Sequence, residues 1–145
     1  MCGSRFGSRQ VVFVCWNRGE RLPTFVHHSY TQTTSIKVDA MNLIDMATED
    51  YQSHQKEVLA VQSSIQKIYE YEKHRPKNEI TVKQWEILTD SSRILGRFIT
   101  KWKTEKTLGK VYIEDKKKNI AFVFDQIAGF YSPKVGNKLN AAKTF

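Results

Sequence analysis

Apolar positions between residues 36 and 75 recur at alternating intervals of three and four, which predicts one long amphipathic helix. The helix is expected to end at Arg75, because Pro76 disfavours helical geometry in the preceding residue and cannot donate a backbone hydrogen bond. Its apolar stripe contains Ile44, Ala47, Tyr51, His54, Val58, Val61, Ile65 and Ile68. Such a stripe needs a partner, which is either another helix of this chain or the same helix in a second copy.

Two shorter helices are expected next, with a polar turn between them. Thr81 is predicted to cap the first helix, and Gln84 stands three residues later, as in a capping box. The buried face of this helix is expected to contain Val82, Trp85 and Leu88. Residues 89–92 read Thr-Asp-Ser-Ser, whose side chains compete with the backbone for hydrogen bonds, so they predict a turn.

The second short helix is predicted over residues 92–106. Its inward positions are expected to be Leu95, Phe98, Ile99 and Trp102, and its outward positions Arg93, Arg97, Lys101 and Lys103. Gly96 lies inside this helix, where glycine costs about 1 kcal/mol relative to alanine. We interpret Gly96 as a sign that another part of the backbone approaches the helix closely.

After Gly109 the apolar period changes to two, which predicts two strands. Val111 and Ile113 would share one face of the first strand, and Ile120, Phe122 and Phe124 one face of the second. The polar residues 115–119 would join the strands as a hairpin. A further short helix is expected over residues 124–131.

This succession of elements, from about Val61 to Phe124, resembles a winged helix-turn-helix domain. The fold class expected is therefore mainly α with a small β-hairpin, a winged helix-turn-helix preceded by a long amphipathic helix. The resemblance implies that the helix over 92–106 lies in a DNA major groove, with Arg93 and Arg97 against guanine edges or phosphates. The implied nucleic-acid-binding residues are Ser91, Ser92, Arg93, Arg97, Lys101, Lys116, Lys117 and Lys118.

The distribution of charge agrees with a polyanionic partner for the C-terminal half. The net charge is +8. Residues 39–73 contain seven acidic residues against three lysines, whereas residues 97–145 contain eleven basic residues against four acidic ones. Because the middle helix would repel phosphates, a nucleic-acid surface is expected mainly in the C-terminal half.

A length of 145 residues fits one compact domain with extensions. We expect an extension over 1–35, a helical winged domain over 36–131 and a basic tail over 132–145. This extension is expected to be mobile or loosely docked, with its apolar run at 11–16 adding a strand or docking on a neighbour. Because it is rich in arginine and hydroxyl residues, a role in organelle import is the alternative. Few cysteines and no long apolar run favour a cytoplasmic or nuclear protein without a membrane span.

No motif of an enzyme or of a cofactor site is present, so neither activity nor cofactor is expected. Cys2, Cys15, His27 and His28 could gather zinc only with unusual geometry, because twelve residues separate the two cysteines. We therefore expect no metal.

The sequence favours a small protein that binds double-stranded DNA, as a transcriptional regulator or replication accessory. It would form a homodimer, or bind a helical partner subunit, through a seam of Ile44, Tyr51, Val58, Val61, Ile65 and Ile68. The alternative is an α-helical, coiled-coil scaffold or adaptor subunit of a larger complex, with no nucleic-acid role. In that alternative the seam packs against the stripe of Trp85 to Trp102 as an antiparallel helical hairpin, closed by residues 76–80.

Overall fold

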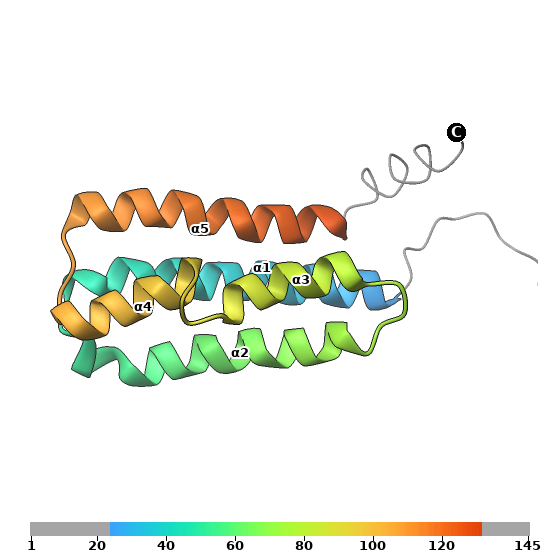
Figure 1. The fold of residues 1–145 in the computed structure, drawn as a ribbon, viewed down its shortest axis with the longest axis horizontal. Coiled ribbons are helices and arrows are strands. Elements are labelled where there is room, and N and C mark those ends of the chain that lie inside the picture. Colours follow the sequence, from blue (N-terminus) through green and yellow to red (C-terminus); the bar gives the residue numbers. More distant parts are fainter. Residues whose placement is uncertain (1–23, 132–145) are drawn as a thin grey trace, which may run out of the picture.

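The structure is a computed structural model that describes residues 24–131, and every regular element in this range is a helix (Figure 1). The α-helices are α1 (Thr24–Asp45), α2 (Gln55–Lys73), α3 (Glu79–Thr89), α4 (Ile94–Glu105) and α5 (Lys110–Phe130). Two short 3-10 helices, η1 (Met46–Thr48) and η2 (Tyr51–His54), connect α1 to α2.

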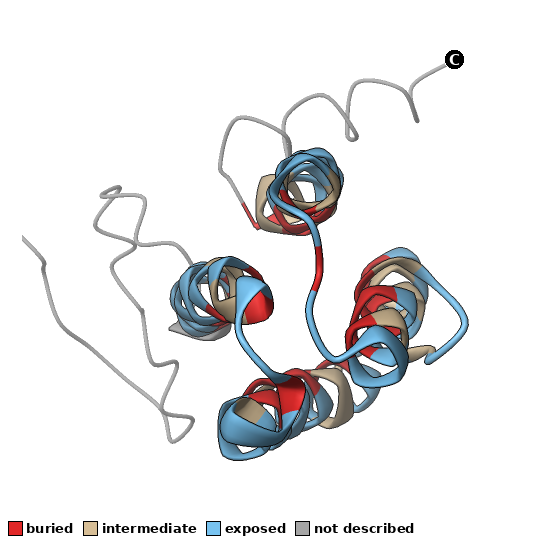
Figure 2. Ribbon diagram, turned by 90° about the vertical axis from the view of Figure 1, so that its left-hand side faces the viewer, coloured by how far each residue is buried: buried red, intermediate tan, exposed pale blue. Residues whose placement is uncertain are grey.

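The helices form an antiparallel four-helix bundle in which α3 and α4 together make the third arm (Figure 1). Viewed along the bundle, α1 lies between α2 and α5, and the third arm closes the ring between α2 and α5 (Figure 2). The buried positions face the centre of this ring in every arm. Short connections between antiparallel neighbours are typical of such bundles.

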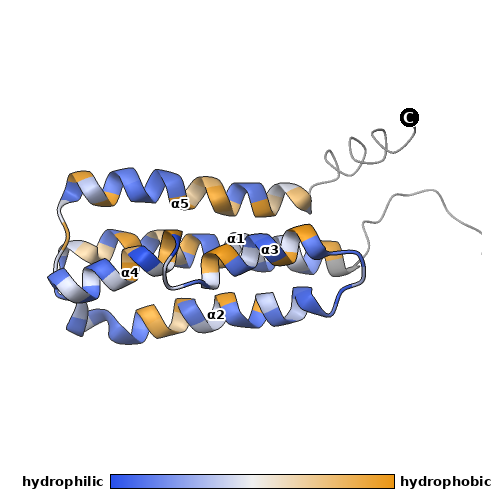
Figure 3. Cartoon of the chain, viewed as in Figure 1, coloured by the Kyte–Doolittle hydropathy of each residue, from blue (hydrophilic) through white to orange (hydrophobic). Residues whose placement is uncertain are grey.

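One apolar core runs through the bundle, because each arm contributes a stripe at helical spacing. Its largest fully buried side chains include Trp85, Trp102, Phe98, Phe124, Leu43 and Ile44. Polar residues cover the outer surfaces, so each helix mixes both classes along its length (Figure 3). Within residues 24–131, none of the helices combines the length and the apolar character that crossing a membrane requires.

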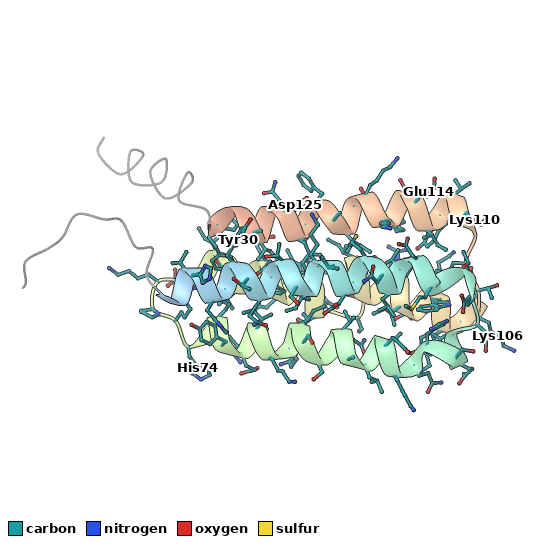
Figure 4. All side chains as sticks on the ribbon, turned by 180° about the vertical axis from the view of Figure 1, so that it is seen from behind. Tyr30, His74, Lys106, Lys110, Glu114 and Asp125 are labelled. Carbon is teal, nitrogen blue, oxygen red and sulfur yellow. The ribbon has the colours of Figure 1, made fainter. Side chains whose placement is uncertain are left out.

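Hydrogen bonds join two chain reversals at one end of the bundle. The N–H of Tyr51 donates to the carbonyl of Lys106 at 2.9 Å, and the N–H of Leu108 donates to the carbonyl of Ala47 at 2.8 Å. These bonds connect the α1–α2 reversal to the α4–α5 connection. Lys106 is labelled at this end in Figure 4, and His74 at the other.

A buried carboxylate organises the opposite end. The Glu72 side chain is fully buried and accepts hydrogen bonds from Ser29 Oγ at 2.5 Å and Arg75 Nη1 at 2.7 Å, and also from Asn78 Nδ2. Ser29 lies near the start of α1, and the Arg75 guanidinium lies over the ring of Tyr131, beyond the end of α5. Because Asn78 is the N-cap residue of α3, the network joins all four arms, and its hydrogen bonds compensate for the burial of the charge.

The single helix predicted over 36–75 is wrong. Residues 36–45 end α1, residues 46–54 reverse the chain, and α2 begins at Gln55. Ala47 and Tyr51 are buried in the reversal. The apolar spacing therefore continues through residues 46–54, and the sequence pattern does not reveal that the helix ends there. Residues 24–35, which the sequence assigned to an extension, form the first half of α1.

The winged helix-turn-helix is also wrong, because α5 occupies the place of the expected hairpin. Val111 and Phe122 would have faced inward in strands, but their side chains are 83% and 61% exposed. The buried residues of α5 are Ile113, Ile120, Phe124 and Ile127, which share one helical face. Residues 115–119 contain no glycine to favour a tight hairpin turn, and lysine is a good helix former.

The two shorter helices and the turn between them are confirmed, with two corrections. First, α3 begins at Glu79, so Thr81 is a buried residue inside the helix rather than its cap. Second, the turn does not fold α4 back, since α4 continues along the third arm (Figure 1). The close approach inferred at Gly96 is confirmed, because a Cβ there would collide with backbone atoms of Asp90 and Ser91.

A candidate basic groove between α4 and α5

A groove of about 890 Å³ lies between α4 and α5. Four of the residues that line it are cationic and none carries a carboxylate. The lining comprises Ile87, Ser92, Arg93, Ile94, Arg97, Phe98, Lys101, Tyr112, Lys116, Asn119 and Ile120. We call this site the basic groove.

The sequence spacing places the cations on the two walls. Arg93, Arg97 and Lys101 follow one another at intervals of four residues, so they form a row along α4 with about one cation per turn. Lys116 belongs to α5, on the opposite wall. A ligand in the basic groove therefore meets positive charge from both sides.

Neighbouring carboxylates bind two of the three cations in this row. Arg93 Nε lies 3.2 Å from Asp90 Oδ2, and Lys101 Nζ lies 2.9 Å from Glu105 Oε1. The hydrogen bond to Glu105 raises the pKa of Lys101, whereas the charge of Arg97 acts to lower it. Arg97 is exposed and has no ion pair with any residue in the range 24–131. Among the three cations of this row, it is the one whose charge is most available to a ligand.

The N-terminal end of the row is held in place by the turn before α4. Asp90 Oδ1 accepts hydrogen bonds from the Ser92 N–H at 2.8 Å and from the Ser92 hydroxyl at 2.7 Å. These bonds, with a smaller contribution from the charge of Arg93, lower the pKa of Asp90. The turn thus keeps a carboxylate ionised beside Arg93, outside the lining of the groove.

The floor of the basic groove is apolar and aromatic. Phe98 is buried, and its ring is stacked nearly parallel to that of Tyr112, with ring centroids 6.1 Å apart. Lys101 Nζ and Lys116 Nζ lie 4.8 Å and 5.4 Å from the centroid of the Tyr112 ring. Such cation–π contacts hold both ammonium groups near the groove while leaving them partly hydrated. Lys116 also contacts Asp115, at 2.9 Å.

The arrangement is suited to binding an anion that has an apolar face. Within residues 24–131, no group of three or more His, Cys, Asp or Glu residues is placed to hold a metal ion. Sequence analysis also weighed a zinc site of Cys2, Cys15, His27 and His28. Both cysteines lie outside the described residues. The predicted extension before residue 24 and the tail after 131 lie outside them as well.

The structure brings together five of the eight residues predicted to bind nucleic acid, namely Ser92, Arg93, Arg97, Lys101 and Lys116. The other three point elsewhere. Ser91 lines a separate groove beside α2. Lys117 pairs with Asp45 of α1 at 2.5 Å, and Lys118 is exposed without lining the groove. The lysines separate because successive helical residues point in different directions, whereas a hairpin tip would have gathered them.

The predicted dimer seam lies inside the bundle. Ile44, Tyr51, Val58, Val61, Ile65 and Ile68 are all buried against other helices of the same chain. Sequence analysis offered two partners for this stripe, another helix of this chain or the same helix in a second copy. The structure shows that the stripe packs against other helices of this chain. Because these residues are buried within one chain, they are not available as a dimer interface. The homodimer itself stays a prediction.

Apart from Lys116, sequence reasoning missed the groove residues contributed by α5, and it missed the role of Phe98 in the floor. Tyr112, Asn119 and Ile120 were assigned to a hairpin. The signal that would have found them is the spacing of Tyr112 and Lys116, one helical turn apart, beside the buried face of α5. Phe98 was expected to be buried, which is confirmed.

Comparisons of the chain with models of protein families, with curated proteins and with solved structures found no match. The geometry of the basic groove is therefore the basis for proposing a function.

Proposed function

We propose that this protein is an adaptor module that holds an acidic, amphipathic helix of a partner protein in the basic groove. The observation that carries the proposal is the combination of cationic walls with an apolar floor between two helices. Helix-in-groove binding uses these two features, because apolar side chains of the ligand enter the groove while polar ones meet its rim. The proposal develops the adaptor alternative and places the protein in the cytoplasm or nucleus.

The apolar floor favours a protein ligand over duplex DNA. Contacts to the phosphates of a duplex require cations but gain nothing from the half-buried apolar side chains of Ile87, Ile94 and Tyr112 between them. The described residues also offer no wing and no helix that stands out from the bundle to enter a major groove. Double-stranded DNA stays a prediction from the sequence, and it is one of the ligands in the experiment.

The charges give the partner helix a preferred pattern. Arg93, Arg97 and Lys101 recur every four residues, so carboxylates at the same interval on a helix lying along α4 can meet them in register. Arg97 is expected to contribute most, because it gives up no ion pair within residues 24–131 on binding and can contact a carboxylate with two N–H groups. Leucines on the same face of the partner helix would contact the half-buried Ile87, Ile94 and Tyr112 of the lining.

Fluorescence anisotropy of labelled ligands tests the proposal. The main probe is a synthetic helical peptide with glutamate at every fourth position beside a leucine stripe. The protein variant is Arg97→Glu with Lys116→Glu, which reverses one charge on each wall. We expect the wild-type protein to bind the peptide and this variant to bind about tenfold more weakly or worse, a loss of about 1.4 kcal/mol.

The matched control is Lys56→Glu with Lys67→Glu on α2, which changes the net charge equally at exposed positions outside the groove. It should bind the peptide nearly as the wild type does. A duplex oligonucleotide and a peptide with the leucines replaced by serine are the comparison ligands. Tighter binding of the duplex than of the peptide, or no effect of removing the leucines, would overturn the proposal.

A further inference from the structure

A second groove, of about 440 Å³, lies on the other side of the third arm, between α2 and the break that separates α3 from α4. None of the residues that line it carries a charge, although charged residues make up 26% of the chain. The lining comprises Leu59, Gln62, Ser63, Ile65, Gln66, Leu88, Thr89, Ser91, Leu95, Gly96, Ile99 and Thr100. We call this site the neutral groove.

Figure 1 shows the break between α3 and α4 in the third arm. Residues at this break form one wall of the neutral groove. Gly96 lets the backbone of Asp90 and Ser91 approach α4 closely, and both Gly96 and Ser91 belong to the lining. Its apolar lining includes Ile65, Leu88 and Leu95, each at most 2% exposed. Hydroxyl and amide side chains stand among these apolar residues, and Leu59, 64% exposed, belongs to the same lining.

We infer that the neutral groove binds an uncharged, mainly apolar small molecule with hydroxyl or carbonyl groups at its edge. The volume lies within the range of about 300–1,000 Å³ that is typical of small-molecule sites, and an apolar lining with a few polar groups is their usual composition. A charged ligand is disfavoured, because it would lose hydration without meeting an opposite charge in the lining. This inference is independent of the function proposed for the basic groove.

The probe for the test is N-phenyl-naphthylamine, an uncharged aromatic compound that fluoresces strongly in apolar sites. We expect saturable binding of one molecule per wild-type chain. Leu59→Lys puts a charge into the lining at an exposed position, and Thr100→Trp fills the groove from another exposed position. Both variants should weaken binding at least tenfold while circular dichroism shows the same helix content.

Two controls separate this site from the rest of the surface. Val111→Lys makes the same kind of change at an 83% exposed position on α5, and Arg97→Glu with Lys116→Glu alters only the basic groove. Neither should change binding of the probe. The sulfonated analogue of the probe, measured in the Arg97→Glu, Lys116→Glu protein, should bind at least tenfold more weakly than the uncharged form.

The inference is overturned if no saturable binding occurs, or if Leu59→Lys and Val111→Lys have equal effects. It is also overturned if the sulfonated analogue binds as tightly as the uncharged probe, or if only the basic-groove variant removes binding.

Discussion

The Cα of Gly96 lies so close to the carbonyl of Asp90 that no side-chain atom fits between them. The obstructing atoms belong to the backbone of the turn, which cannot move without shifting α4. We therefore expect Gly96→Ala to destabilise the protein by about 1–3 kcal/mol, as other overpacked substitutions do. This loss should occur although alanine is the better helix former. Urea denaturation followed by circular dichroism measures the difference.

The same substitution at Gly129 provides the control. Gly129 lies within α5, and nothing stands within 4 Å of the position of its missing Cβ. Gly129→Ala should stabilise the protein by up to about 1 kcal/mol. If both substitutions shift the free energy of unfolding in the same direction, the close approach at Gly96 is not present in solution.

The break between α3 and α4 should accept proline. The N–H of Arg93 donates to the carbonyl of Asp90 at 3.1 Å, which makes Ser91 the second residue of a turn, where the φ of proline fits. Asp90 is extended, with ψ 119°, as a residue before proline prefers. We expect Ser91→Pro to leave stability unchanged or to raise it by about 0.4–1 kcal/mol.

Thr100→Pro, in the middle of α4, is the comparison for that prediction. It should cost about 3 kcal/mol or more, because it removes a helical hydrogen bond and clashes with the preceding turn. Equal losses from Ser91→Pro and Thr100→Pro in thermal unfolding would show that the third arm is continuous.

The phenol of Tyr131 makes the stability sensitive to alkaline pH. Burial raises the pKa of Tyr131 well above its ordinary value of 10, while the hydrogen bond from Trp85 Nε1 at 3.4 Å acts in the opposite direction. A raised pKa means that the folded state holds the proton more tightly than the unfolded state. The contribution of Tyr131 is therefore fully present below about pH 10 and is lost as the pH rises further.

Denaturation at pH 8 and pH 11 tests this prediction, with Tyr131→Phe as the comparison, since lysines also lose protons in this range. The wild-type protein should lose more stability between the two pH values than Tyr131→Phe does. Parallel losses would mean that the phenol is accessible to water in the folded state.

Arg75 compensates for the buried charge of Glu72, so removing it should be costly. Arg75→Met leaves a fully buried carboxylate without its cationic partner, and we expect a loss of about 3–5 kcal/mol. Lys73→Met breaks an exposed pair of the same spacing, with Glu70, and should cost less than about 1 kcal/mol. Thermal unfolding of the two variants measures both losses of stability. Similar losses would mean that Arg75 does not compensate for a buried charge on Glu72.

The sequence predicted helix over α2, α3 and α4 because their buried positions are apolar and recur at helical spacing, although it joined α2 to the end of α1. It missed the first half of α1 because two buried positions there, Ser29 and Thr33, are polar. These residues precede Ile36 and Ala40 on the same helix face. Because serine and threonine are polar, the hydropathy pattern does not identify them as buried. The burial of Ser29 depends on its hydrogen bond to Glu72, 43 residues later in the chain. A local sequence pattern cannot predict such a contact.

The error at α5 has a different cause. Ile120 and Phe124 fit both a strand and a helix, and the exposed Phe122 between them makes the alternation look complete. The row of Arg93, Arg97 and Lys101 followed from the predicted helix and its period. That Lys116 and Tyr112 complete a groove with this row follows only from the packing of α4 against α5, which is a tertiary contact.

Exchange of charges between protein and ligand is the most direct measurement of whether the basic groove binds an acidic helix. Arg97→Glu should weaken binding of the glutamate-containing peptide. A peptide in which the central glutamate is replaced by lysine should bind the wild-type protein weakly and Arg97→Glu more tightly. We expect the exchanged pair to recover most of the lost affinity, because opposite charges then meet again. If the lysine peptide binds both proteins equally weakly, Arg97 does not contact the ligand and the basic groove does not hold an acidic helix in this way.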